Sequence, residues 1–92
     1  MKDKFYVTKW INESLDMRLI IYIQTLIATL EVDTDYLQVF DISENILIHS
    51  QEEPEYSREY RLSKKYKDKK LFCIRTDDEK YSYWTLMFSS EY

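Results

Sequence analysis

Residues 15–30 of this chain read LDMRLIIYIQTLIATL, and this stretch decides the fold class. Its large apolar residues recur every three or four positions, at Leu15, Leu19, Tyr22, Ile23, Leu26, Ile27 and Leu30. This spacing places them on one face of an amphipathic helix. Asn12 or Ser14 is expected to cap its N-terminus, and the acidic turn that follows predicts an end near residues 30–32.

The segments on both sides of this helix are rich in β-branched and aromatic residues, which favour strands. One such segment, residues 4–10, precedes the helix. Five follow it: residues 36–42, 46–50, 55–62, 71–76 and 80–88. Pro54 falls between two of them and is expected in a loop or at the first residue of an edge strand.

Two hairpins are expected among these strands. Asn45 predicts a turn between the first two, because asparagine most readily replaces glycine in the left-handed conformation. Residues 77–79 predict the second turn, and the lysine-rich residues 64–70 predict a solvated loop. The sequence thus predicts a single α+β domain over residues 1–92. One amphipathic helix packs on a mostly antiparallel sheet, in the order β-α-β-β-β-β-β.

The chain has no glycine among its 92 residues. Glycine supplies positive φ and lets the backbone approach a ligand closely. Phosphate-binding loops, dinucleotide-binding fingerprints and nucleophile elbows all need it at fixed positions. These sites are therefore excluded in their usual form. Recognition is left to side chains on a sheet, and these usually contact another macromolecule.

Several features bear on the compartment. The longest apolar run, residues 19–23, is far shorter than the ~20 residues that cross a bilayer. No charged and apolar leader opens the chain, and the single Cys73 cannot form an internal disulfide. We therefore expect a soluble, cytoplasmic protein with no membrane segment.

The formal net charge of −4 is unevenly distributed along the chain. Residues 31–59 carry nine acidic residues and a single basic one, Arg58. Residues 60–80 carry eight basic residues against four acidic ones. Such an asymmetry can steer a charged partner, although it does not bear on the fold.

Two stretches resemble a known family. Residues 35–40 read DYLQVF, and residues 49–56 read HSQEEPEY. Together with residues 6–8 and the helical stripe, they resemble the bacterial family catalogued as "domain of unknown function 960". The resemblance covers most of the chain except the C-terminal hairpin. It implies a Gram-positive, especially staphylococcal, setting that includes mobile genetic elements, and it implies no catalytic role.

Candidate catalytic residues are few. His49 is the only histidine, with Ser50 beside it and Asp41 across the predicted hairpin. Adjacent strand residues point to opposite faces, and nothing identifies an oxyanion hole, so a triad is not expected. Cys73 is expected to be a small packing residue, and zinc sites need about four ligands. No carboxylate pair stands out for acid–base hydrolysis. The sequence thus predicts neither an enzyme nor a metal or cofactor site.

A protein-binding surface is the preferred interpretation. Glu53, Glu55 and Glu59 are expected on one strand face, at about 6.6 Å per two residues, which resembles the spacing of phosphates along a nucleic-acid strand. Such a surface would mimic DNA and occupy a host DNA-binding protein. Tyrosine is enriched at interface hot spots. The predicted contact residues are Glu53, Glu55, Tyr56, Glu59, Tyr60, Tyr81 and Tyr83. Self-association into a homodimer stays open.

The alternative is nucleic-acid binding through the predicted basic loop. Lysines would contact phosphates and the tyrosine within the loop would stack on a base. The residues concerned are Lys64, Lys65, Tyr66, Lys67, Lys69 and Lys70. The net acidic charge of the protein opposes this alternative.

Overall fold

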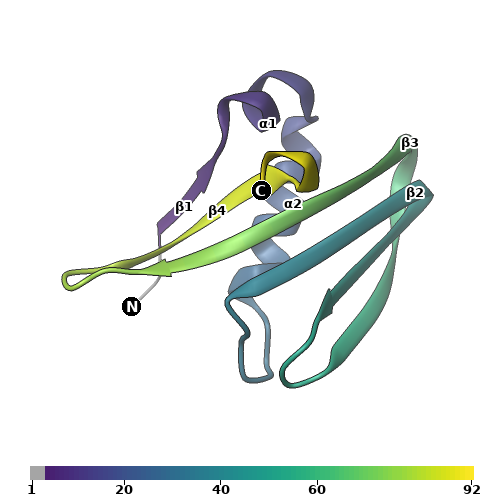
Figure 1. Cartoon of the computed structure of the whole chain (residues 1–92). Coiled ribbons are helices and arrows are strands. Elements are labelled where there is room, and N and C mark those ends of the chain that lie inside the picture. Colours follow the sequence, from purple (N-terminus) through teal and green to yellow (C-terminus); the bar gives the residue numbers. More distant parts are fainter. Residues whose placement is uncertain (1–3) are drawn as a thin grey trace.

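The computed structural model describes residues 4–92, which form a four-stranded mixed sheet with the strand order β1-β4-β3-β2 (Figure 1). The elements are β1 (Lys4–Val7), α1 (Lys9–Ser14), α2 (Met17–Ala28), β2 (Leu37–Gln51), β3 (Tyr56–Asp77), β4 (Ser82–Phe88) and the 3₁₀ turn η1 (Ser89–Glu91). β3 pairs antiparallel with both β2 and β4, whereas β1 runs parallel to β4. The predicted α+β class is confirmed. The predicted number of strands is wrong, because β2 and β3 each span two of the expected segments.

The helical region is split into two helices by its capping residues. The Thr8 hydroxyl accepts a hydrogen bond from the Ile11 backbone N–H at 3.3 Å, so the chain turns into α1 and the first strand ends at Val7. The predicted continuation of this strand to residue 10 is therefore wrong. A carboxylate oxygen of Asp16 accepts from the Arg18 N–H at 3.0 Å and caps α2.

These caps replace the predicted ones at Asn12 and Ser14, which both lie inside α1. α2 ends at Ala28, slightly before the predicted end. Its buried residues are Leu19, Ile20 and Ile23, so the apolar stripe does face the core as the spacing predicts.

The predicted hairpin around Asn45 is wrong. β2 continues through this region as one bent strand, and its two halves pair with different parts of β3. In the first half Phe40 is opposite Leu71, and in the second Leu47 is opposite Tyr60. The pairing shifts on both sides of Glu44, which adopts the left-handed φ of 57° that Asn45 was expected to supply. A β-bulge bends a strand without reversing it.

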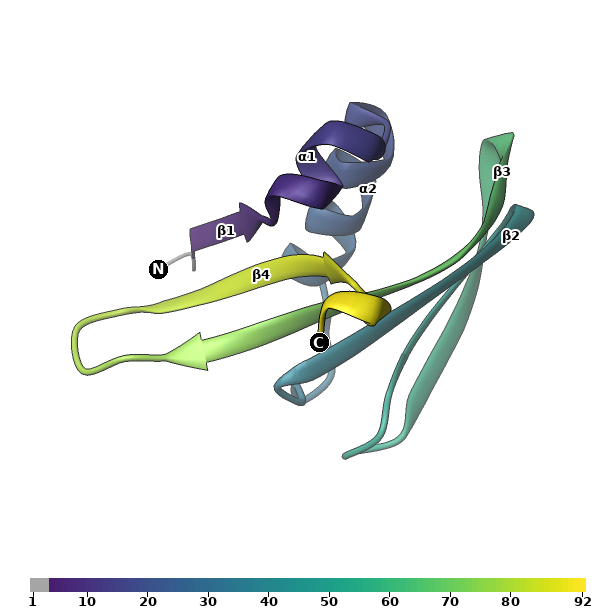
Figure 2. The ribbon, with the colours of Figure 1, turned by 45° about the horizontal axis from the view of Figure 1, so that its top comes forward.

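The two strands therefore form one bent ribbon, defined here as β2 and β3 paired along their length (Figure 2). Because the ribbon folds toward itself, residues from its two halves meet in the core. Phe40 and His49, both in β2, stack with ring centroids 4.5 Å apart. The first half of β2 belongs to the wall that β3 and β4 continue, and the second half forms a separate wall of the core.

Residues 64–70 are strand, not the predicted loop, because they pair with the region around the bend of β2. Tyr66 lies opposite Glu44, and Lys70 lies opposite Asp41. The hydroxyl of Ser43 adds a hydrogen bond to the Asp68 carboxylate at 2.8 Å. These cross-strand contacts hold a highly charged segment in extended conformation.

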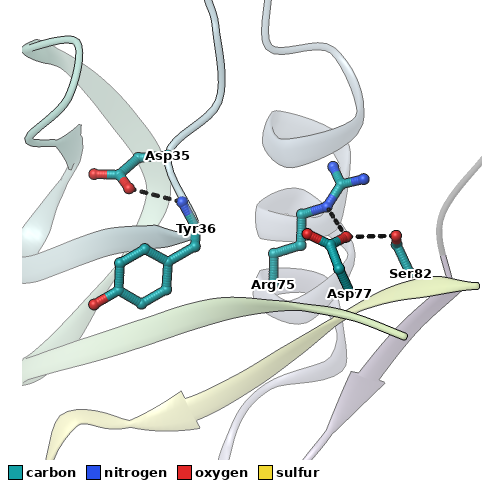
Figure 3. A network of polar contacts seen from close by, with 5 residues as sticks. All are labelled: Asp35, Tyr36, Arg75, Asp77 and Ser82. Atoms are coloured by element: carbon teal, nitrogen blue, oxygen red, sulfur yellow. Dashed lines mark hydrogen bonds and ion pairs between the residues drawn. The ribbon is translucent and has the colours of Figure 1, made fainter. Parts of the chain in front are cut away.

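The C-terminal hairpin follows the prediction. β3 ends at Asp77 and β4 begins at Ser82, and the backbone N–H of Asp78 bonds to the carbonyl of Tyr81 at 2.8 Å. The Asp77 carboxylate accepts hydrogen bonds from Arg75 at 3.0 Å and from the hydroxyl of Ser82 (Figure 3). The hydrogen bond from Ser82 has the larger effect, and together with that from Arg75 it holds the pKa of Asp77 below its usual range. Pro54 lies in the turn between β2 and β3, as predicted.

The core lies between the sheet, the helices and the second half of the bent ribbon. Its fully buried aliphatic residues come from every layer. The buried members are Ile11, Leu15, Leu19, Ile20, Ile23, Phe40, Ile42, Leu47, Leu71, Cys73, Trp84 and Leu86. Because alternate strand residues point to opposite faces, every second residue of the sheet points away from this core.

Candidate functional site

The outer face of the sheet is the surface turned away from the helices, which lie together on the other side (Figures 1 and 2). The strand pairings align apolar and aromatic residues across it. Met87 is opposite Phe72, which is opposite Val39; in the next row Thr85 is opposite Ile74, which is opposite Leu37. All of these side chains are half-buried, although this face lies outside the core.

Three tyrosines extend this face at the β1 and β4 edge, and we call Tyr6, Tyr81 and Tyr83 the tyrosine patch. The rings of Tyr6 and Tyr83 meet edge to face with centroids 5.5 Å apart, and those of Tyr81 and Tyr83 lie 5.9 Å apart. Tyr6 is 47% exposed and Tyr81 42%. The ammonium group of Lys4 lies 5.3 Å from the centre of the Tyr81 ring. The patch is thus continuous, aromatic and accessible.

The C-terminal residue lies over another part of the outer face. The ring of Tyr92 contacts Phe72 at a centroid distance of 5.6 Å. The carboxylate of Glu91 fixes this end of the chain, because it accepts hydrogen bonds from the Thr8 hydroxyl at 3.0 Å and the Phe88 N–H at 2.8 Å. A hydrogen bond with Tyr92 raises the pKa of Tyr36, so these two side chains meet as well.

A second surface feature, the acidic end, is made by two segments that side-chain bonds hold together. The amide nitrogen of Gln51 donates to the carbonyls of Asp33 and Pro54, both at 2.8 Å. The carboxylate of Asp35 accepts hydrogen bonds from the backbone N–H of Tyr36 (Figure 3) and, at 3.2 Å, from the backbone N–H of Glu53. The acidic end comprises Glu31, Asp33, Asp35, Glu52, Glu53 and Glu55, and these segments contain no basic residue.

A buried chain of polar side chains supports the acidic end from inside. His49 Nε2 lies 2.7 Å from the Gln38 side-chain oxygen, and the Gln38 nitrogen donates to the Gln51 side-chain oxygen, also at 2.7 Å. Gln38 donates in addition to the carbonyl of Asp35 at 2.9 Å. Because Gln38 uses its nitrogen for these bonds, its oxygen accepts from a proton on His49 Nε2.

His49 is therefore a core residue. It is fully buried, and burial lowers its pKa to about 4. Its other ring nitrogen, Nδ1, has no hydrogen-bond partner among residues 4–92. Ser50 lies opposite Ser57, and Asp41 lies beside Lys70 on the other half of the ribbon. The structure therefore does not bring His49, Ser50 and Asp41 together as a triad.

The structure divides the predicted protein-contact residues among different places. Glu53 and Glu55 lie in the turn that precedes β3, so the prediction that they share a strand face with Glu59 is wrong. Tyr56 and Tyr60 point inward instead. The Tyr56 ring lies 5.5 Å from that of His49, and the Tyr60 ring lies 6.1 Å from that of Tyr22 on α2. Only Tyr81 and Tyr83 meet as a surface cluster.

The lysines of the alternative site are partly neutralised. Lys64 forms an ion pair with Asp16 at 2.9 Å, and Lys65 with Glu44 at 3.5 Å. The pair with Lys64 holds the pKa of Asp16 at about 2. Lys70 lies 4.0 Å from Asp41.

The remaining members of that set make local contacts. Lys69 donates to the Lys67 carbonyl at 2.8 Å, and burial lowers the pKa of Lys69. The Tyr66 hydroxyl donates to Asp16 at 3.1 Å, and its half-buried ring lies 5.4 Å from the ammonium groups of both Lys64 and Lys69. These contacts reduce the charge and the ring surface available to a nucleic acid.

Other reactive groups are equally enclosed. Cys73 is fully buried, and burial raises the pKa of its thiol. Within residues 4–92 no group of three His, Cys, Asp or Glu side chains is arranged to hold a metal ion. In the same part of the chain, no helix has the length and apolar character needed to cross a membrane.

Three residues that form or support these surfaces were missed by sequence reasoning. Tyr6 joins Tyr83 only because β1 pairs with β4, which lies at the other end of the chain. Gln38 and Gln51 are polar residues at buried strand positions, and strand alternation places Gln38 on the same face as Phe40. That alternation was the available signal.

Comparisons with protein-family models, curated proteins and solved structures find no match for this chain.

Proposed function

We propose that this protein is a non-enzymatic protein-binding module that contacts its partner through the tyrosine patch and the adjoining outer face. The observation that carries the proposal is the continuous contact of Tyr6, Tyr83 and Tyr81 on an exposed sheet surface. Tyrosine combines a large apolar ring with a polar hydroxyl, and it is enriched among residues that dominate binding energy. Apolar side chains of the outer face extend the contact area beyond the patch.

The acidic end gives the surface a preference for a basic partner. It adjoins the start of β2, and the tyrosine patch adjoins the start of β4, so both lie toward the same end of the sheet. Charge complementarity raises association rates and selects among partners. A DNA-binding protein offers the required basic surface.

A more specific form of the proposal follows from the resemblance to the family catalogued as "domain of unknown function 960". In a mobile genetic element, the protein would act in the cytoplasm as a DNA-mimic inhibitor of a host DNA-metabolism or defence protein. The regular glutamate spacing no longer supports this idea, since Glu53 and Glu55 lie in a turn. Its support is the acidic end, where acidic residues from two segments gather without a basic neighbour in those segments.

The absence of catalysis is supported by the burial of the reactive groups. His49 and Cys73 are both fully buried, and a nucleophile or general base must reach its substrate.

The test is affinity capture from a Gram-positive bacterial lysate, followed by a binding measurement with the captured protein once purified. The double variant Tyr6→Ala/Tyr81→Ala should weaken binding at least about tenfold, as expected for interface hot spots. The matched control is Ile21→Ala, which removes a 54% exposed apolar residue from α2. This control should bind like the wild type.

A second variant, Glu52→Lys/Glu53→Lys, tests the role of the acidic end. It should slow association and weaken its dependence on salt. Equal binding by the wild type and the tyrosine double variant would contradict the proposal.

A further inference from the structure

A groove of about 620 Å³ lies between α1 and the end of β4. Its lining residues are Trp10 and Ser14 from α1, and Phe88, Ser90 and Glu91 from the C-terminal segment. Trp10 and Ser14 are four positions apart, so they lie on one face of α1. Phe88 packs against the core, which places the groove on the helical side of the sheet. The groove is therefore separate from the tyrosine patch and does not depend on the proposed function.

Two hydrogen bonds hold the half-buried carboxylate of Glu91 beside α1. Its Oε2 atom accepts from the hydroxyl of Thr8, the residue that caps α1, at 3.0 Å, and from the backbone N–H of Phe88 at 2.8 Å. Both donors are neutral, and within residues 4–92 no basic group forms an ion pair with Glu91. In the same part of the chain, its other oxygen, Oε1, accepts no hydrogen bond. The groove therefore keeps one fixed negative charge without a counter-charge.

Trp10 supplies an aromatic surface to the same groove. Its side chain is 59% exposed, and its ring contacts no other ring and no cation among the residues that the structure describes. A cation within ~6 Å of the centre of an aromatic ring is attracted to the face of the ring, and tryptophan attracts it most strongly. An exposed indole and an unpaired carboxylate in one groove suit an organic cation.

The hydrogen-bonding groups of the groove select among organic cations. An alkylammonium group carries three N–H donors on a compact charge, whereas a guanidinium group binds a carboxylate best through parallel bonds to both of its oxygens. Oε2 of Glu91 already accepts two hydrogen bonds, which leaves Oε1 for a single donor. The hydroxyl groups of Ser14 and Ser90 are acceptors for the remaining N–H groups. A quaternary ammonium group has no N–H and would leave these acceptors unused.

We propose that this groove binds a primary alkylammonium group, with the ammonium held by the Glu91 carboxylate and the Trp10 ring, and the alkyl stem against Phe88. Pockets of ~300–1,000 Å³ hold small ligands, so the groove is large enough for a lysine-sized side chain. A free alkylamine and a lysine side chain in a peptide share this chemistry. The groove recognises the feature they share, and separate probes distinguish the two sources.

The experiment is a titration of the ¹⁵N-labelled full chain at pH 7 and low salt, followed by chemical shifts. The two amine probes are n-butylamine and acetyl-lysine methylamide. Both should shift the indole N–H of Trp10 and the amides of Ser14 and residues 88–91, and whichever binds more tightly identifies the source. The comparison probes are the uncharged acetyl-norleucine methylamide, acetyl-arginine methylamide and tetramethylammonium. The preferred amine should bind at least about tenfold more tightly than the norleucine probe, as expected for a charge-assisted hydrogen bond.

The variant Glu91→Gln removes the charge but keeps an oxygen that accepts from Thr8 and Phe88, and it should weaken amine binding at least about tenfold. Its matched control is Glu13→Gln, an exposed glutamate of α1 that does not line the groove, which should bind like the wild type. Trp10→Leu keeps an apolar side chain but removes the ring, and it should weaken binding about two- to fivefold. Unchanged amide spectra away from the substitutions show that these variants fold.

Three results would overturn the proposal. The first is a comparison probe that binds as tightly as the preferred amine. The second is wild-type affinity in Glu91→Gln. The third is a titration in which the amines leave the Trp10 indole unshifted or shift the acidic end instead, because the protein would then attract cations only through its general charge.

Discussion

His49 stacks on Phe40 with ring centroids 4.5 Å apart, although both residues belong to β2 and lie on opposite sides of its bend. This contact exists because the strand folds toward itself around Glu44. It also fixes the position of the imidazole from which the buried polar chain begins. His49 therefore contributes both to the bend of the ribbon and to the buried polar chain that supports the acidic end.

The pH dependence of stability should reveal the burial of His49. Its pKa falls from 6.5 to about 4 on folding, so between these values the unfolded chain binds a proton that the folded chain does not. The folded state therefore has its full stability above pH 6.5. As the pH falls toward 4, the free energy of unfolding decreases by roughly 3 kcal/mol. Urea unfolding at pH 7.5 and pH 4.5 measures it. The variant His49→Phe should lose less stability over this range, and equal losses would contradict the prediction.

Replacing Gln51 by alanine should loosen the acidic end. The substitution removes the hydrogen bonds that Gln51 donates to the carbonyls of Asp33 and Pro54 and those that it accepts from the Gln38 side-chain amide and the Asp35 N–H. Losing a partner for a buried polar group costs about 1–3 kcal/mol. Hydrogen exchange should accelerate at the amides of residues 33–35, 52 and 53. Gln24→Ala, an exposed substitution on α2, serves as the control. It should leave both the free energy of unfolding and these exchange rates unchanged.

Replacing Glu44 by glycine should stabilise the protein, although the chain itself contains no glycine. Glu44 has φ of 57°, and a left-handed conformation costs an L-residue with a Cβ about 1–2 kcal/mol. The greater freedom of glycine in the unfolded chain offsets part of this gain, so Glu44→Gly should raise stability by about 0.5–1 kcal/mol. Thermal unfolding checks the direction. The same substitution at Glu59, in the extended part of β3, should destabilise; if both variants lose stability, the bend is not where the structure has it.

The two tryptophans should report different environments. Trp10 is 59% exposed on α1, whereas Trp84 is 4% exposed in β4. In Trp84→Phe the remaining fluorescence should resemble that of a hydrated indole and should be quenched strongly by acrylamide. In Trp10→Phe the emission should be shifted to the blue and resist quenching. Similar quenching in both variants would argue against the position of β4 in the core.

Local patterns predicted the elements better than their connections. The stripe of Leu19 and Ile23 identified α2 because helical periodicity depends on near neighbours. The turn predicted at Asn45 could not be distinguished from a β-bulge, because a left-handed residue occurs in both structures. What distinguishes the two is the partner strand, and Phe40 pairs with Leu71 instead of a residue just beyond the turn.

The candidate surfaces show the same limit. Tyr83 was predicted as a contact residue because it lies on a predicted strand and tyrosine is enriched at interfaces, and the structure places it in the tyrosine patch. Tyr56 and Tyr60 were predicted on the same ground, but the bend of the ribbon turns them toward His49 and Tyr22. The direction in which a strand face points is a property of the whole fold, which a single strand does not encode.

The continuity of β3 has a consequence for how the protein opens. Its 22 residues form part of both walls of the core, so neither wall is an independent unit. A fluctuation that releases the second half of the ribbon must either break the strand at its bend or disturb the pairing with β4. We expect the slowest-exchanging amides of both walls to share one opening free energy, as members of a single cooperative unit.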